Sequence, residues 1–118
     1  MKNGDLQART RRYALRVIDL VESLPRGRSA DVIGNQLLRC ATSVGANYRA
    51  ACRPRSTADF IAKLGIVEEE ADESLYWLDL LAESNLVPRE RLTDLMTEAD
   101  EILAMTVASI RTAKSRRS

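Results

Sequence analysis

Apolar residues recur every three or four positions along most of the chain, which is the spacing of one face of an α-helix. Four such runs are separated by short segments that contain proline, glycine or asparagine. The pattern predicts helices over about residues 5–24, 30–52, 57–84 and 88–113, with a frayed basic tail over 114–118. No stretch alternates apolar and polar residues as a half-buried strand does.

The breaks between the runs determine how the helices are arranged. Pro25 and Gly27, then Pro54, then Asn85 and Pro88 interrupt the pattern. Connections of about three to five residues force successive helices to be antiparallel. We therefore predict an all-α protein, an antiparallel up-down four-helix bundle in which residues 1–118 form a single domain. A long helical hairpin that dimerises is the alternative, and the breakers at three sites disfavour it.

Composition narrows the class of protein. Hydrophobic residues make up 45% of the chain and charged residues 30%, the balance of a globular rather than a disordered protein. No apolar run of about 18 residues exists, so the sequence predicts no membrane-spanning helix. The first residues lack the apolar segment of a signal peptide, and we expect a cytoplasmic protein.

The sequence holds little that resembles catalytic chemistry. The chain has no histidine, which removes the commonest general base and the commonest metal ligand. Cys40 and Cys52 fall about 18 Å apart on one predicted helix, too far to form a disulfide. The densest carboxylate set is Glu68 to Glu70 with Asp72 and Glu73, and it lacks the Glu-x-x-His pairs of di-iron bundles. We expect no enzyme, no catalytic residue, no metal and no cofactor.

Two predicted helices carry more apolar or small residues than a bundle core requires. An exposed apolar cluster that the core does not need usually marks an interface. Glycine inside a helix costs about 1 kcal/mol of helix stability relative to alanine, and the close approach of another helix can compensate for this cost. Packing of the tryptophan at a helix boundary within one chain is the alternative that the pattern leaves open. The candidate residues for a subunit interface are Gly34, Leu38, Gly45, Tyr76, Trp77 and Leu80.

Charge is unevenly distributed although the formal net charge is only +1. Residues 1–55 hold eleven Lys or Arg and four Asp or Glu, whereas residues 56–104 hold three and thirteen. The basic part could contact nucleic-acid phosphates, or it could pair with the acidic part within or between subunits. The candidate nucleic-acid surface comprises Arg9, Arg12 and Arg16 on one predicted helix face and Arg49, Arg53 and Arg55 near the second break.

Three segments of the middle of the chain resemble a known family. They are Ser43-Val44-Gly45-Ala46-Asn47-Tyr48-Arg49-Ala50-Ala51, then Ser56 with Asp59-Phe60-Ile61-Ala62-Lys63-Leu64, and then Glu70-Ala71-Asp72-Glu73-Ser74 with Tyr76-Trp77-Leu78. These segments resemble the four-helix-bundle proteins associated with intervening sequences of 23S ribosomal RNA genes. That family is similar to the accessory variability determinant of diversity-generating retroelements.

The resemblance implies a four-helix protomer, often assembled into a homopentamer, with no enzymatic activity. For the retroelement relative it implies that a basic surface binds nucleic acid and a reverse transcriptase. We therefore expect a homo-oligomeric, pentameric binding or scaffold module. Its expected partners are RNA or DNA and a protein encoded nearby, such as a reverse transcriptase. The alternative is a protein–protein interaction module with no nucleic-acid role.

Overall fold

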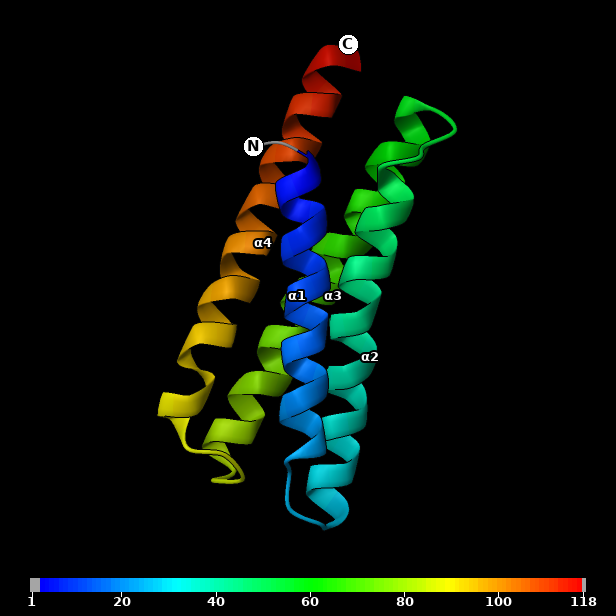
Figure 1. The fold of residues 1–118 in the computed structure, drawn as a ribbon. Coiled ribbons are helices and arrows are strands. Elements are labelled where there is room, and N and C mark those ends of the chain that lie inside the picture. Colours follow the sequence, from blue (N-terminus) through cyan, green and yellow to red (C-terminus); the bar gives the residue numbers. More distant parts are fainter. Residues whose placement is uncertain (1–2, 118) are drawn as a thin grey trace.

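The computed structural model describes residues 3–117, with side chains from 5 to 116, and shows four antiparallel α-helices (Figure 1). They are α1 (Asn3–Glu22), α2 (Arg28–Ala51), α3 (Thr57–Glu83) and α4 (Arg89–Arg117). The bundle is elongated, with extents of 49 × 22 × 20 Å. The predicted all-α up-down four-helix bundle is confirmed.

The connections follow from local backbone chemistry. Gly27 has φ 154°, which only glycine adopts readily, and it precedes α2 without a side-chain cap. Ser56 caps α3 by accepting a hydrogen bond from the Asp59 N–H at 3.0 Å. At the end of α3, Asn85 has φ 61°, and Leu86 N–H donates to the Leu81 carbonyl at 3.1 Å. This pairing is a Schellman cap.

Helix α4 continues to Arg117, beyond the expected end at residue 113. The tail from Lys114 onward was expected to fray, but it is helical up to Arg117. Ser118 lies outside the described residues. No glycine or proline interrupts this segment, and basic residues near a helix C-terminus are stabilised by the helix dipole. In Figure 1 this last part of α4 extends past the N-terminal end of α1.

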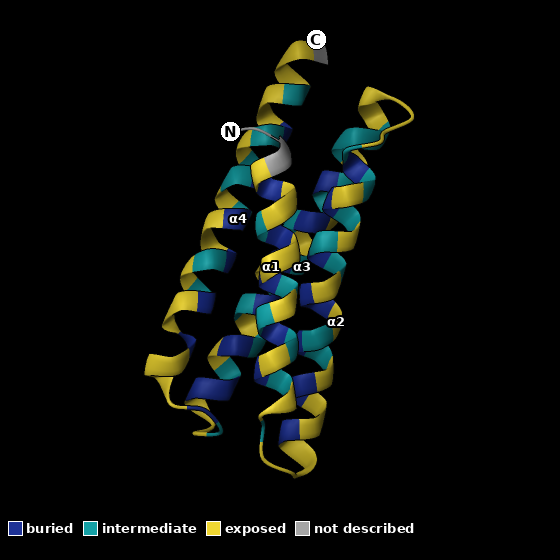
Figure 2. Ribbon diagram, viewed as in Figure 1, coloured by how far each residue is buried: buried dark blue, intermediate teal, exposed yellow. Residues whose placement is uncertain are grey.

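The core lies along the bundle axis, where buried positions recur at helical spacing on each helix (Figure 2). It also holds a polar chain that joins two helices. The Tyr13 hydroxyl lies 2.8 Å from Ser74 Oγ, and Ser74 Oγ donates to the Ala71 carbonyl at 2.7 Å. Tyr13 is therefore the donor to Ser74, and this buried pair is satisfied. It links α1 to α3 across the core.

Helix α1 packs unequally on its two neighbours. Its approach to α2 is close at two glycines: a Cβ on Gly34 would lie 3.0 Å from Leu24 Cδ1, and one on Gly45 would lie 3.4 Å from the Thr10 carbonyl oxygen. Its contact with α4 is the smallest among the neighbouring helix pairs. Helix α1 is therefore held mainly by α2.

Two further expectations concern the cysteines and the membrane. Cys40 is buried, Cys52 is half-buried, and both are free thiols. Among the described residues, no helix combines the length and the apolar character that crossing a membrane requires.

Candidate functional site

The arginines of the candidate nucleic-acid surface do not form one continuous surface. Arg9 turns toward α4, where its Nη2 lies 2.7 Å from Glu98 Oε1 and 2.6 Å from Glu101 Oε1. Its Nε also donates to Glu98 Oε2 at 3.0 Å. Because both hydrogen-bonding edges are occupied within the chain, Arg9 is a structural link between α1 and α4. A phosphate contact of Arg9 stays a prediction, and it would compete with these two carboxylates.

Arg12 and Arg16 lie on the same side of α1 as Arg9. The Arg9 hydrogen bond holds the pKa of Glu98 below its ordinary value, and the charges of Arg16 and Arg12 lower it further. Arg12 is exposed and Arg16 is half-buried, and neither makes an ion pair among the described side chains. The Glu98 carboxylate of α4 therefore offsets part of the positive charge of Arg12 and Arg16.

Two other arginines are also paired within the chain. Arg39 on α2 contacts Glu70 at 2.9 Å and Glu73 at 2.6 Å, both on α3. Arg89 at the start of α4 contacts Asp79 at 3.2 Å and Glu83 at 2.8 Å. The acidic residues of α3 and α4 are thus partly neutralised by arginines of the same chain. Exposed pairs of this kind contribute little to stability.

A different pair of arginines borders an open groove between α1 and α2. The groove measures about 530 Å³, and Arg11 and Arg49 both line it. Both arginines are exposed, and within the described part of the chain neither guanidinium forms an ion pair. Gln7 and Thr42 add polar groups to the same groove. These side chains give the groove between α1 and α2 a basic, polar lining.

Small residues form the groove. Ala14 on α1 and Gly45 and Ala46 on α2 line it, and Gly45 allows the Thr10 backbone to come close. Arg49 was predicted from the sequence and Arg11 was not, because a helical face was assigned to Arg9, Arg12 and Arg16. The signal was present: Arg11 is two positions from Arg9, so a helix turns it to another side.

Arg53 and Arg55 lie beyond the groove, in the connection between α2 and α3, and both are exposed. The backbone N–H of Arg55 donates to Asp59 Oδ2 at 3.1 Å. Arg55 lines a second hollow, about 450 Å³ in volume, at this end of the bundle.

The six candidates for a subunit interface divide into two groups. Gly34 is buried beneath Val21 and Leu24, and Gly45 lies against the Thr10 backbone. Within the chain, the close approach that these glycines predicted is made by α1 and by Leu24 just after it. Their place in a subunit interface stays a prediction. Leu38 on α2 is half-buried.

The three α3 candidates lie at the surface to different degrees. Tyr76 is 57% exposed, and its ring packs edge-on against Trp77 with centroids 4.9 Å apart. Trp77 and Leu80 are partly buried against the core. The Trp77 Nε1–H donates to Glu73 Oε2 at 3.0 Å.

The outer side of α3 has two more features that the sequence analysis did not select. Ile66 is 39% exposed, and a Cβ added at Gly65 would meet no atom within 4 Å. Gly65 therefore costs helix stability without allowing a close approach inside the protomer. We call Gly65, Ile66 and Tyr76 the α3 outer surface.

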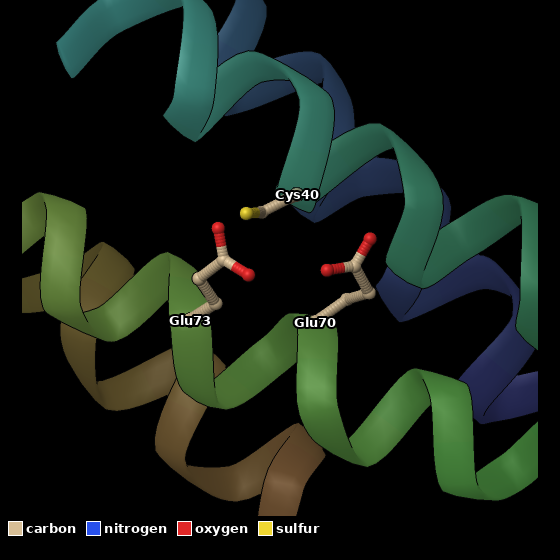
Figure 3. Close-up of side chains that lie close together, drawn as sticks. All are labelled: Cys40, Glu70 and Glu73. Carbon is tan, nitrogen blue, oxygen red and sulfur yellow. The ribbon is translucent and has the colours of Figure 1, made fainter.

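Cys40, Glu70 and Glu73 form a cluster between α2 and α3 that could present three ligand atoms to a metal ion (Figure 3). These atoms lie within 4.8 Å of one another. Burial, followed by the hydrogen bond to Glu73, raises the pKa of Cys40 to about 12. The Trp77 hydrogen bond, with Cys40 and Arg39, holds the pKa of Glu73 below its ordinary value.

The existing contacts of this cluster argue against a metal site. The Arg39 guanidinium already binds both carboxylates and donates to Cys40 Sγ at 3.2 Å. A metal ion would have to displace this cation and remove the proton from a thiol that burial keeps neutral. The cluster is better described as a hydrogen-bonded contact between α2 and α3, which sequence spacing alone could not reveal.

Comparisons with known proteins agree with the fold. A crystal structure of a protein of unknown function from the S23 ribosomal protein family of Bacteroides thetaiotaomicron matches with a TM-score of 0.87 and 34% identity. The match covers 94% of this chain and 99% of that one. A comparison with curated proteins finds no match.

A family model described as the 23S rRNA-intervening sequence protein matches residues 2–108. This match spans most of the chain and all four helices except the end of α4. The chain therefore belongs to the family of 23S rRNA-intervening sequence proteins.

Proposed function

We propose that this protein is a non-enzymatic, homo-oligomeric binding module that holds RNA or DNA in the groove between α1 and α2. The observation that carries the proposal is the contrast among the arginines. Arg9, Arg39 and Arg89 each bind carboxylates of the same chain, whereas Arg11 and Arg49 face an open groove without one among the described residues. Two free guanidinium groups beside one groove suit phosphate oxygens.

The chemistry of the groove supports a phosphate backbone as its ligand. Arg11 and Arg49 would supply charge, while Gln7 and Thr42 offer hydrogen bonds that do not depend on base sequence. Contacts of this type give affinity and position rather than specificity. Since the family is named for intervening sequences of 23S rRNA, RNA is the first probe to use.

A titration with generic RNA at two salt concentrations tests the groove. We expect binding at about 50 mM salt that weakens steeply toward about 200 mM, because phosphate contacts release counterions. The double variant Arg11→Gln/Arg49→Gln should weaken binding about tenfold or more and reduce the salt slope by about 2. The matched control is Arg26→Gln/Arg28→Gln, which removes equal charge from exposed residues beside the α1–α2 turn.

Two results would reject nucleic-acid binding in this groove. One is wild-type protein that shows no binding, or no salt slope, at about 50 mM salt. The other is equal loss in the groove variant and the control, since that would point to net charge rather than to the groove.

The oligomer is proposed on the α3 outer surface. Ile66 and Tyr76 are exposed apolar side chains, and Gly65 would permit a close approach that nothing within the protomer makes. This helix is also acidic, so the basic surface of α1 or α2 of a second copy is a complementary partner. A pentamer is the assembly that the family resemblance implies.

Sedimentation of wild type against Tyr76→Asp tests the assembly. Tyr76 is preferred to Trp77, because Trp77 also packs on the core and binds Glu73. We expect an oligomer for the wild type and a smaller species for the variant, with Glu22→Gln as an exposed control on α1. A wild-type monomer would instead favour the alternative of an interaction module whose α3 outer surface binds a different protein, such as a reverse transcriptase encoded nearby.

A further inference from the structure

The second hollow lies at the end of the bundle where α2 joins α3 and where α4 ends. Its walls combine Pro54 and Arg55 of the connection, Phe60 of α3, and Ala113 and Arg116 of α4. Its volume of about 450 Å³ falls within the usual range of small-ligand pockets, about 300 to 1,000 Å³. The groove between α1 and α2 shares none of these residues, so the two hollows are separate sites.

The two arginines of this hollow have no carboxylate partner among the described side chains. The nearest acidic group in sequence, Asp59, is already engaged. Its Oδ2 accepts from the Arg55 backbone N–H at 3.1 Å, and its Oδ1 lies 3.3 Å from Lys63 Nζ. The backbone hydrogen bond from Arg55, followed by the Lys63 contact, holds the pKa of Asp59 below its ordinary value, and the Arg55 charge adds to this effect. Neither guanidinium forms an ion pair among the described side chains, so both can bind an anion.

An aromatic ring stands beside these arginines. Phe60 is the single phenylalanine of the chain, and it lines the hollow while packing partly against the core. The core contact holds the ring in place, and the part that lines the hollow can be reached by a ligand. A fixed aromatic surface beside cationic groups is the combination that binds a base together with its phosphate.

We propose that this hollow binds one nucleotide of a single-stranded nucleic acid, with the base stacked on Phe60 and the adjacent phosphate held by Arg55 and Arg116. This inference rests on the proposed nucleic-acid function and adds the class of ligand. In a duplex the base surfaces are covered by stacking, so a duplex offers no base to Phe60. Single strands should therefore bind better than duplexes of the same sequence.

The test compares a ten-nucleotide single-stranded RNA with its duplex by fluorescence anisotropy, using the full chain. Phe60→Leu keeps apolar volume but removes the ring. It should weaken single-strand binding about tenfold, leave duplex binding unchanged and leave the salt slope unchanged. Arg55→Gln/Arg116→Gln should instead lower the single-strand salt slope by about 1.4. A 2-aminopurine base in the strand should change its fluorescence with wild type and not with Phe60→Leu.

The outcomes separate this inference from the groove assignment. If wild type binds RNA and Arg11→Gln/Arg49→Gln weakens it, but Phe60→Leu binds single strands as wild type does, the groove stands and the hollow is rejected. If both variants at the hollow lose single-strand binding while the groove variant does not, the hollow stands and the groove is rejected. An equal affinity for free adenosine monophosphate and the ten-nucleotide strand would also overturn the hollow as a strand site. Unfolding midpoints of all variants by circular dichroism verify that binding is compared between folded proteins.

Discussion

The two sides of α1 are built from similar residues and have different roles. On the side facing α4, Arg9 binds Glu98 and Glu101, although this is the smallest of the contacts between neighbouring helices. On the side facing α2, Arg11 borders an open groove, although Gly45 lets the α1 backbone come close to α2. The role of an arginine here depends on which neighbour carries carboxylates, not on the arginine itself.

The physical cause is the division of charge between the helices. Thirteen of the 17 acidic residues belong to α3 and α4, and Arg9, which faces α4, is neutralised there by Glu98 and Glu101. The wall of the groove that α2 contributes consists of Thr42, Gly45, Ala46 and Arg49 and offers no acid. The side of α1 whose backbone lies close to Gly45 is therefore also the side where Arg11 meets no carboxylate.

Breaking the α1–α2 contact should give the largest effect. Gly34→Leu would place a side chain at a buried position where a Cβ alone lies 3.0 Å from Leu24 Cδ1 and 3.4 Å from Val21 Cγ1. We expect a loss of about 3 kcal/mol in the free energy of unfolding, the upper end of the cost of overpacking, measured by denaturant titration. Gly65→Leu is the matched control on α3, where nothing lies within 4 Å. It should leave the unfolding free energy unchanged or raise it, and equal losses at both glycines would contradict the comparison.

Removing one arginine from each side of α1 should give an intermediate effect. Arg9→Gln leaves Glu98, whose side chain is only 18% exposed, without its charged partner. We expect a loss of about 1–2 kcal/mol in the free energy of unfolding. Arg11→Gln breaks no ion pair and should change it by less than about 0.5 kcal/mol. Thermal unfolding of the two variants side by side checks this, and a larger loss for Arg11→Gln would reverse the assigned roles.

Acidification should reduce the difference between these two variants, which is the smallest effect of the three. The pKa of Glu98 lies below 4.5 in the folded protein because Arg9 donates hydrogen bonds to it. A folded pKa below the unfolded one stabilises the fold above about pH 4.5, and that contribution is lost as the pH falls through the folded value. The destabilisation caused by Arg9→Gln should therefore decrease as the pH falls through the folded pKa of Glu98. A difference that stays constant from pH 7 to about pH 3 would mean that Arg9 acts by packing alone.

Local chemistry explains why the fold could be predicted. Periodic apolar residues predicted four helices, and the capping roles of Ser56 and Asn85 were visible in the residue types. The end of α4 was misjudged because polar, basic residues after Ile110 were expected to fray. A helix without glycine or proline can continue past its last core contact.

The candidate site was only partly predictable. Arg49 lines the groove as part of the expected basic surface, but Arg9 is paired and Arg11 was missed. The interface glycines were correctly linked to a close helix approach, yet the approaching helix is α1 of the same chain. In each case the spacing of the residues along the sequence defined one face of a helix. Which helix packs opposite that face then decided which contacts the residues make.

The sequence by itself determined the helices, their antiparallel order and the separation of basic and acidic segments, because these follow from neighbours along the chain. Only the tertiary structure decided which arginines meet carboxylates, which glycine has empty space around it, and where Phe60 meets Arg55 and Arg116. Those outcomes depend on how each helix is rotated about its axis and on which residues, far away in sequence, lie opposite. The periodicity of one helix carries no information about the residues on its neighbour.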